Sequence, residues 1–258
     1  MGRYFIQRMA ILKHILCGGL LLLLTACGSM SNVRENTLLR GAVLPHHLLV
    51  ESFIDEFYQH LQREFSDVRK IILLSPNHFG YGLRYVQMSE SPRYFPKEHG
   101  IMVHIPFIKK YFSDAEILPI ILKPQTPQEN LDALVKELLP RVDVQTLVLA
   151  SVDFTHYVGE KDALENDARA IAWLESNESV DFEKILGLAK SIAIGKSDEG
   201  DDAVAFDSPE TLYVTLKLME AQGARHFVLW KRTSSASLMN LVDPAQNTSH
   251  VFGTFERK

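Results

Sequence analysis

Short apolar runs alternate with amphipathic stretches along most of the chain after residue 40. Several of these runs are almost continuously apolar, which is typical of strands covered on both faces of a sheet. Turn-forming or polar residues bound them, as expected for strands joined by loops or helices. We therefore expect six strands, at residues 41–44, 70–74, 116–122, 146–150, 225–230 and 250–255.

The stretches between the expected strands have the pattern of helices. One apolar stripe has members four residues apart and predicts a helix, namely Leu49, Phe53, Phe57, Leu61 and Phe65. Residues 126–129 (Thr-Pro-Gln-Glu) have the layout of a capping box with proline at the first helical position. Residues 207–210 (Asp-Ser-Pro-Glu) begin another helix, which Gly223 is placed to end.

This alternation of strands and helices predicts the fold class. We expect α/β, a single layered domain over residues 41–258 with a largely parallel or mixed central sheet flanked by helices. The composition agrees, since 46% hydrophobic and 23% charged residues exclude a disordered chain and a multi-pass membrane protein.

The N-terminal residues have the layout of a secretion signal. Arg3, Arg8 and Lys13 precede an apolar run over residues 15–24, and the first 26 residues contain no acidic side chain. The run is shorter than the roughly 20 residues that a membrane-spanning helix needs. This pattern favours export over a membrane span.

The residues that follow the apolar run resemble the lipobox of bacterial lipoproteins. Residues 24–29 read Leu-Thr-Ala-Cys-Gly-Ser, and in a lipobox the cysteine receives lipid, including palmitate, and becomes the first mature residue. We therefore expect a lipoprotein signal peptide at residues 1–26, and a lipidated Cys27 with a polar tether at residues 27–40. The alternative is an ordinary cleaved secretory signal with a coincidental cysteine.

Export and the overall charge both limit the partners that we expect. The residue after Cys27 is glycine rather than aspartate, which favours the outer membrane, facing the periplasm. Without the three basic residues of the signal, 24 basic residues face 32 acidic ones, and the formal net charge is −8. Nucleic-acid binding needs a basic surface, so we expect a membrane partner through the lipid and no nucleic acid.

Histidines follow three of the expected strands directly. His46 and His47 come after the first strand, His78 after the second, and Asp153 and His156 after the strand at residues 146–150. Ligands of α/β sheets bind at this edge. Two or three histidines with a carboxylate suit zinc or ferrous iron. The alternative is that each histidine is only a loop residue or a helix cap.

Four sequence blocks resemble the motif series of the Memo family, whose bacterial members are also named AmmeMemoRadiSam system protein B. The blocks are residues 42–46 (AVLPH), 74–78 (LSPNH), 98–107 (EHGIMVHIPF) and 151–157 (SVDFTHY). The last block is the most specific of them. The resemblance covers nearly all of residues 41–258 and implies the fold of class III extradiol dioxygenases.

The resemblance also implies roles for individual residues. His46 and His78 would be metal ligands, with Asp153 and His156 beside them. We expect a divalent ion, with iron, zinc and copper as the candidates. His156 would be the catalytic acid or base, oriented by Asp153. Glu98 and His99, which begin the third block, would line the cofactor pocket.

The chain departs from the family pattern at the expected thiolate ligand. A cysteine near the C-terminus completes the site in Memo-like proteins, whereas Ser237 or a neighbour occupies that place here. Either Asp153, Glu98 or His47 completes a site without a thiol, or the site is a polar pocket that holds no metal.

Two function classes follow from the resemblance and from this departure. The first is a metal-dependent enzyme, an oxidoreductase of dioxygenase-like type or a hydrolase. The second is a binding or scaffold lipoprotein that holds a small molecule or a peptide in the same pocket without turnover. Cytosolic family partners such as radical S-adenosylmethionine proteins rank lower, because the N-terminal signal predicts export.

Overall fold

A computed structural model of the chain describes residues 39–190, 204–241, 243 and 246–258. The chain divides into two units, Met1–Thr37 and Leu38–Lys258. The predicted signal peptide and Cys27 lie outside the described residues, and the fold below is that of the second unit. Among the described helices, none combines the length and the apolar character needed to cross a bilayer.

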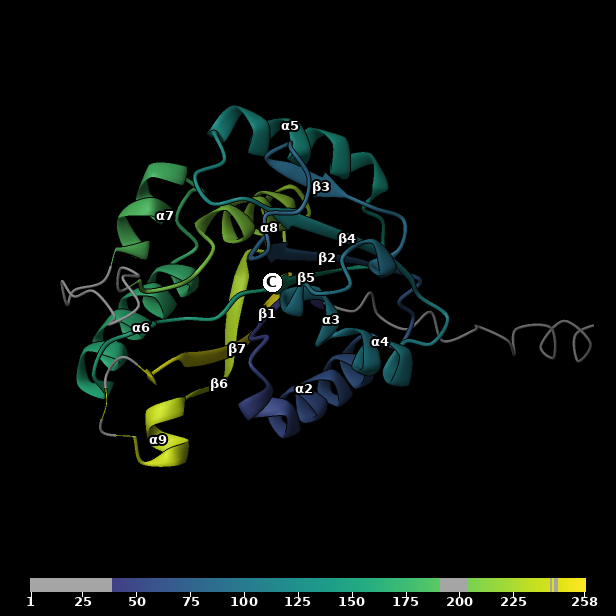
Figure 1. Cartoon of the computed structure of the whole chain (residues 1–258). Coiled ribbons are helices and arrows are strands. Elements are labelled where there is room, and N and C mark those ends of the chain that lie inside the picture. Colours follow the sequence, from purple (N-terminus) through teal and green to yellow (C-terminus); the bar gives the residue numbers. More distant parts are fainter. Residues whose placement is uncertain (1–38, 191–203, 242, 244–245) are drawn as a thin grey trace, which may run out of the picture. The chain divides into compact units, whose positions relative to one another are not determined.

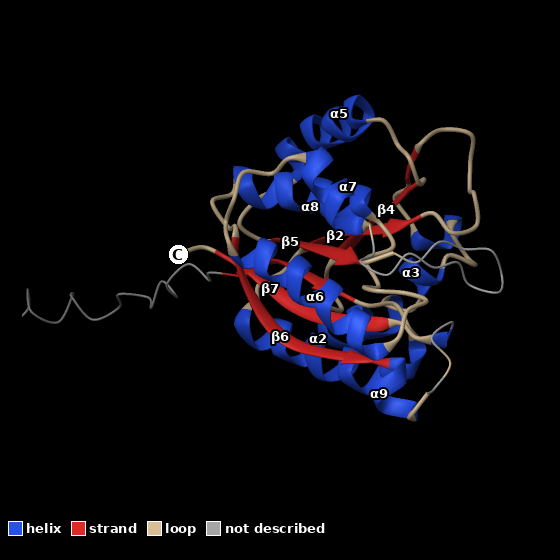
Figure 2. Cartoon of the chain, turned by 90° about the vertical axis from the view of Figure 1, so that its left-hand side faces the viewer, coloured by secondary structure: helices blue, strands red, loops and turns tan. Residues whose placement is uncertain are grey.

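A mixed sheet of seven strands forms the centre of this unit (Figures 1 and 2). The spatial order is β3-β4-β2-β5-β1-β7-β6, in which β4, β2, β5 and β1 are parallel and the remaining pairs are antiparallel. This arrangement confirms the predicted α/β class with a parallel core. The strands are β1 (Leu39–Leu44), β2 (Lys70–Pro76), β3 (Val86–Met88), β4 (Glu116–Leu122), β5 (Thr146–Ser151), β6 (His226–Ser234) and β7 (Ser249–Glu256).

Helices cover both faces of the sheet (Figure 1). One face packs against α5 (Gln128–Leu138), α6 (Glu160–Glu175), α7 (Phe182–Ala189) and α8 (Pro209–Ala221). The other face packs against α2 (Glu51–Glu64), α3 (His99–Met102) and α4 (Ile105–Tyr111). The short helix α9 (Ser235–Met239) follows β6, and single 3-10 turns occur at η1 (Leu48–Val50), η2 (Pro92–Tyr94) and η3 (Leu139–Arg141).

The two helical layers explain the continuous apolar runs of the sequence. Successive side chains of a strand point to opposite faces of the sheet. In β2, Ile71 and Leu73 pack against the layer that contains α2, whereas Ile72 and Leu74 pack against the layer that contains α8. All four are fully buried. Both faces must therefore be apolar.

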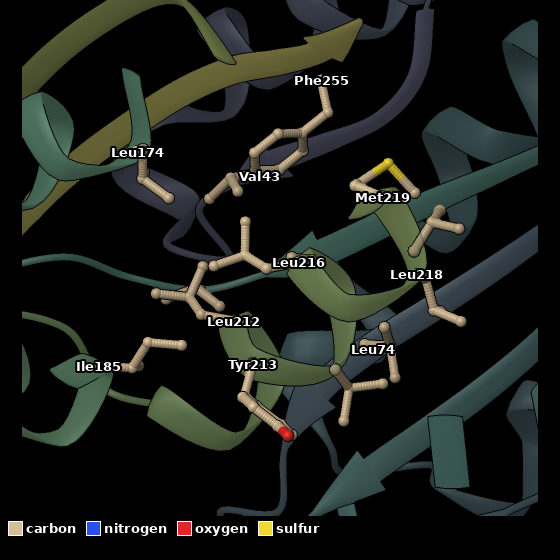
Figure 3. Close-up of a cluster of buried hydrophobic side chains, with 14 of the residues drawn as sticks. Val43, Leu74, Leu174, Ile185, Leu212, Tyr213, Leu216, Leu218, Met219 and Phe255 are labelled. Atoms are coloured by element: carbon tan, nitrogen blue, oxygen red, sulfur yellow. The ribbon is translucent and has the colours of Figure 1, made fainter. Parts of the chain in front are cut away.

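Helix α8 lies at the centre of one core (Figure 3). Its residues Leu212, Leu216 and Met219 are buried together with Val43 of β1 and Leu74 of β2. The same cluster therefore joins α8 to the two strands whose ends deliver the predicted histidines. This packing also fixes the segment just before α8.

All six expected strands are present, although β6 extends to Ser234 rather than ending at residue 230. Strand β3 was not predicted, because its three half-exposed residues form no apolar run. The predicted capping box at residues 126–129 is wrong. The Thr126 hydroxyl donates to the carbonyl of Lys123 at 2.6 Å, so it is engaged in the preceding turn and caps no helix. In contrast, Ser208 caps α8 by accepting a hydrogen bond from the backbone N–H of Thr211.

Candidate metal centre

The carboxyl ends of three parallel strands bring the predicted residues to one edge of the sheet. His46 follows β1, His78 follows β2 and Asp153 follows β5. Strand β5 pairs with both β1 and β2, so Asp153 comes from the strand between the two that deliver the histidines. The ring centroids of His46 and His78 are 5.0 Å apart. The expected convergence at the strand ends is confirmed for these residues.

Helix α3 adds a third imidazole to this edge. The His99 ring stacks on His78 with a centroid distance of 4.0 Å and lies 5.0 Å from His46. One ring nitrogen of each of the three histidines lies within 4.8 Å of the others. His46 is buried, whereas 27% of the His78 side chain is exposed, so the cluster is open to solvent on one side. We call these three residues the histidine cluster.

A glycine lets α3 approach the sheet closely enough to place His99. A Cβ atom at Gly100 would collide with the Ser75 hydroxyl at the end of β2. Glu98 immediately precedes α3 and accepts a hydrogen bond from the backbone N–H of Gly100 at 3.4 Å. The predicted pocket residues Glu98 and His99 therefore both lie at the site.

Glu98 holds His78 through two contacts. The Glu98 carboxylate is fully buried, and its Oε2 accepts from the backbone N–H of His78 at 2.9 Å. The Oε1 atom of Glu98 lies 2.5 Å from Nδ1 of His78. This contact places the proton of a neutral His78 on Nδ1 and leaves the Nε2 lone pair available as a ligand.

His46 is held from its backbone and from its ring. Its backbone N–H donates to Oδ1 of Asp153 at 3.1 Å, and its Nδ1 lies 3.0 Å from Oγ of Ser151. The same hydroxyl lies 3.0 Å from Nε2 of the fully buried His104. If Nδ1 of His46 donates to Ser151, the hydroxyl can donate to His104. Nε2 of His46 is then free to bind a ligand.

A third carboxylate faces the histidine cluster and was not predicted as part of the site. Oδ2 of Asp207 lies 3.3 Å from Nε2 of His46 and 3.8 Å from Nε2 of His78. Its sequence pattern indicates only the start of a helix. It reaches the site because Phe206 forms a β-bridge with Phe154, a contact between segments 52 positions apart that no local pattern signals.

His156 lies beside the cluster rather than in it. It is half-buried and forms a β-bridge with Thr248. The charges of Asp207, Asp153 and His46 all act on it. No hydrogen bond joins the described side chains of Asp153 and His156, because the Asp153 carboxylate faces His46 and also His250, at 4.0 Å from Nδ1. The catalytic roles of His156 and Asp153 stay predictions.

Two residues, namely His47 as a candidate to complete the site and Ser237 at the place of the expected thiolate, are held elsewhere. His47 accepts the backbone N–H of Leu49 on its Nδ1 and so caps η1. The Ser237 hydroxyl lies 3.0 Å from Oγ of Ser234, in the capping box of α9. Neither belongs to the group of described side chains that are arranged to hold a metal.

Three buried carboxylates give the site its electrostatic character. Among the described residues, the ion-pair partners of Glu98, Asp153 and Asp207 are all imidazoles. Burial alone would lower the pKa of His78, but the neighbouring carboxylates of Asp207 and Glu98 raise it to about 9. Burial also opposes protonation of His46, yet Asp153 and Asp207 raise its pKa. Both shifts in pKa favour the protonated, positively charged form of the imidazole beside these carboxylates.

The other two imidazoles of this edge are neutral near pH 7. Burial lowers the pKa of His99 to about 4, and the charges of His78 and His46 add to this effect. Burial also lowers the pKa of His104 to about 3. A neutral His99 can bind a metal without losing a proton, whereas His78, with its pKa raised to about 9, must first release one.

The contacts of Glu98 predict a supporting role in metal binding. We expect Glu98→Gln to weaken zinc affinity roughly 10–100-fold, because a neutral amide supports the His78 ring less well than a carboxylate does. The affinity is measured by competition with a chromophoric chelator at about pH 9, close to the His78 pKa of about 9, where proton competition lowers the affinity by only about twofold. The exposed Glu90, changed to glutamine, is the matched control. Equal affinities of Glu98→Gln and the wild type would contradict this role.

Comparison with known proteins identifies a family that this chain resembles. A family model described as Memo-like protein matches residues 84–243, which include Glu98, His99, Asp153, His156 and Asp207. His46 and His78 precede the matched residues. The chain is 30% identical to a MEMO1 family protein of Pyrobaculum arsenaticum over 133 residues, which are 40% of this chain and 47% of that protein.

Two further relatives align over longer stretches. A MEMO1 family protein of Methanosarcina acetivorans is 28% identical over 57% of this chain and 65% of its own length. One of Nitrosopumilus maritimus is 25% identical over 61% of this chain and 67% of its own length. The first relatives are matched over about half of their length or less. Because the family model covers more than half of the chain, the chain belongs to the Memo-like family.

Proposed function

We propose that the chain binds one divalent metal ion at the histidine cluster, with iron, zinc and copper as candidates. The observation that carries this proposal is the approach of three ligand nitrogens to within 4.8 Å of one another. Imidazole is a common ligand of all three metals. The surrounding carboxylates favour a cation over an anionic ligand, because each of them is negatively charged and buried.

The test is metal analysis of the purified protein. Protein prepared without chelator is analysed for bound metal, stripped, and titrated separately with ferrous iron, zinc and copper. We expect about one ion per chain for at least one metal, as a single ligand set implies. Protein that retains no metal and binds none in the titrations would contradict the proposal.

We further propose that the bound ion serves catalysis, in an oxidoreductase of dioxygenase-like type or in a hydrolase. A bound metal would polarise a substrate oxygen or activate water or dioxygen. His156, half-buried beside the cluster, would move a proton as acid or base. Oxygen uptake with catechols and hydrolysis of an ester panel test the two reaction types. Turnover that requires metal and is lost in His156→Gln would support this assignment.

The second candidate is a binding or scaffold protein. The observation that favours it is the placement of Ser237 in the capping box of α9, since a serine hydroxyl there supplies no thiolate. A small molecule or a peptide would then occupy the site without reaction. Stoichiometric metal with no turnover across the panel would favour this candidate.

We also propose that Cys27 anchors the protein, as an exported bacterial lipoprotein, in the outer membrane facing the periplasm. The support is the sequence of residues 24–29, since this part of the chain lies outside the described residues. We expect Cys27→Ser to move the protein from the membrane fraction to the soluble fraction, because one lipidated cysteine carries the attachment. Mass spectrometry of the N-terminal peptide measures the lipid, and membrane retention of Cys27→Ser would contradict the anchor.

A further inference from the structure

The backbone holds Asp207 at the site from two sides. Its N–H donates to the carbonyl oxygen of Asp153 at 3.0 Å, next to the end of β5. The following residue, Ser208, caps α8, whose packing against the sheet fixes this segment. Because Ser208 already caps the helix, Asp207 is not needed for that purpose. Its carboxylate is therefore available for another function.

The side chain of Asp207 is buried without the hydrogen bonds that a carboxylate needs. Only 15% of the side chain is exposed, and neither carboxylate oxygen has a hydrogen bond of normal geometry among the described residues. A buried, charged oxygen in this situation is costly unless a cation lies next to it. The nearest ring nitrogens are Nε2 of His46 and Nε2 of His78.

The distances fit three ligands of one ion. Bonds of about 2.0–2.2 Å from a metal to nitrogen and oxygen ligands place neighbouring ligand atoms roughly 3.0–3.4 Å apart. Oδ2 of Asp207 lies at 3.3 Å from Nε2 of His46 and at 3.8 Å from Nε2 of His78. Only a few tenths of an ångström separate the second distance from that range.

The other two carboxylates are already engaged. Both oxygens of Glu98 contact His78, one at the backbone and one at the ring. Oδ1 of Asp153 accepts a hydrogen bond from the backbone N–H of His46. Oδ2 of Asp153 lies near Nε2 of His46, and no ion pair joins this carboxylate to His78 among the described residues. Of the three carboxylates, Asp207 is thus the one that faces both ring nitrogens with its oxygens uncommitted.

We propose that Asp207 is the anionic ligand of the metal, completing a set of two histidines and one carboxylate with His46 and His78. This inference rests on the proposed metal site. The anionic ligand would then be an oxygen atom rather than the thiolate that the sequence resemblance implies. A harder oxygen ligand favours ferrous iron or zinc over cuprous copper. His99 then lies beside the ion on the side that is open to solvent.

The test compares zinc affinities of Asp207→Asn and Asp207→Glu with the wild type. We expect the isosteric Asp207→Asn to weaken zinc binding by about 10–100-fold, and Asp207→Glu, which keeps the carboxylate, to retain more of the affinity. Asp67→Asn, an exposed position in the turn after α2, is the matched control. A dissociation constant of Asp207→Asn within about threefold of the wild type would overturn the inference.

A second measurement needs no variant. In a crystal structure of the zinc-loaded wild type, with the ion located by anomalous scattering, we expect an Asp207 oxygen at about 2.0–2.2 Å from the ion. An ion bound by His46 and His78 with Asp207 beyond bonding distance would overturn this inference but leave the metal site intact. A wild type that binds no zinc, iron or copper would instead refute the metal site itself.

Discussion

The double variant His46→Ala/His78→Ala is expected to bind no metal. It removes two of the three imidazoles of the histidine cluster, and the remaining His99 and Asp207 are too few ligands to hold an ion at ordinary concentrations. The change also removes the positively charged partners of Glu98 and Asp207. Equilibrium dialysis with zinc, followed by elemental analysis, measures the loss. Full occupancy of the double variant would reject the assignment of these ligands.

A second double variant supplies the control. His60→Ala/His226→Ala also removes two histidines, but neither belongs to the histidine cluster. His60 lies on α2 and stacks on Trp230, and His226 is the first residue of β6. We expect this variant to bind metal like the wild type. Circular dichroism shows whether each variant folds. If the first variant does not fold, His78→Gln at the partly exposed position tests the same ligand with a smaller change to the core.

The sequence predicts which residues gather at the carboxyl edge of the sheet, because two independent patterns, the apolar runs and the polar residues that follow them, agree there. Apolar runs covered on both faces located β1, β2 and β5, and the polar residues that follow these runs had to lie at their carboxyl ends. Parallel pairing then brings those ends together. His46, His78 and Asp153 were therefore found without any knowledge of the strand order.

Residues placed by long-range contacts could not be located in this way. Asp207 belongs to no strand, and its position depends on a β-bridge between Phe206 and Phe154. His99 lies on a helix of four residues, too short to give a periodic signal. Its approach to His78 depends on Gly100, whose missing side chain makes room for Ser75. Such contacts exist only in the folded chain.

Local hydrogen bonds explain why two other candidates lie away from the cluster. His47 was considered as a ligand because it follows His46, but neighbouring residues after a strand point in different directions. Its ring nitrogen caps η1. Serine is favoured at helix starts, and Ser237 bonds to Ser234 within the first turn of α9. Capping thus accounts for the placement of both residues.

Metal affinity is expected to rise steeply between pH 6 and pH 9. In the metal-free protein, the pKa of His78 is raised to about 9 and that of His46 is also raised. Protons therefore compete with the metal at neutral pH. Since each pH unit below the pKa of His78 costs about tenfold in affinity, this residue alone gives roughly 1,000-fold over the interval. Chelator competition at constant ionic strength measures the slope.

Protonation of His78 also gives the unfolding free energy of the metal-free chain a pH dependence opposite to that of the metal affinity. A histidine whose pKa is raised on folding stabilises the fold fully below its unfolded value of about 6.5, and this contribution is lost as the pH rises through about 9. The unfolding free energy of stripped protein should thus fall over this interval, while the stabilisation by added zinc grows.

Glu98→Gln removes one of the anions that hold the proton on His78, so the rise in metal affinity with pH should begin at lower pH than in the wild type. A dissociation constant that does not vary with pH would show that metal binding displaces no proton from these imidazoles.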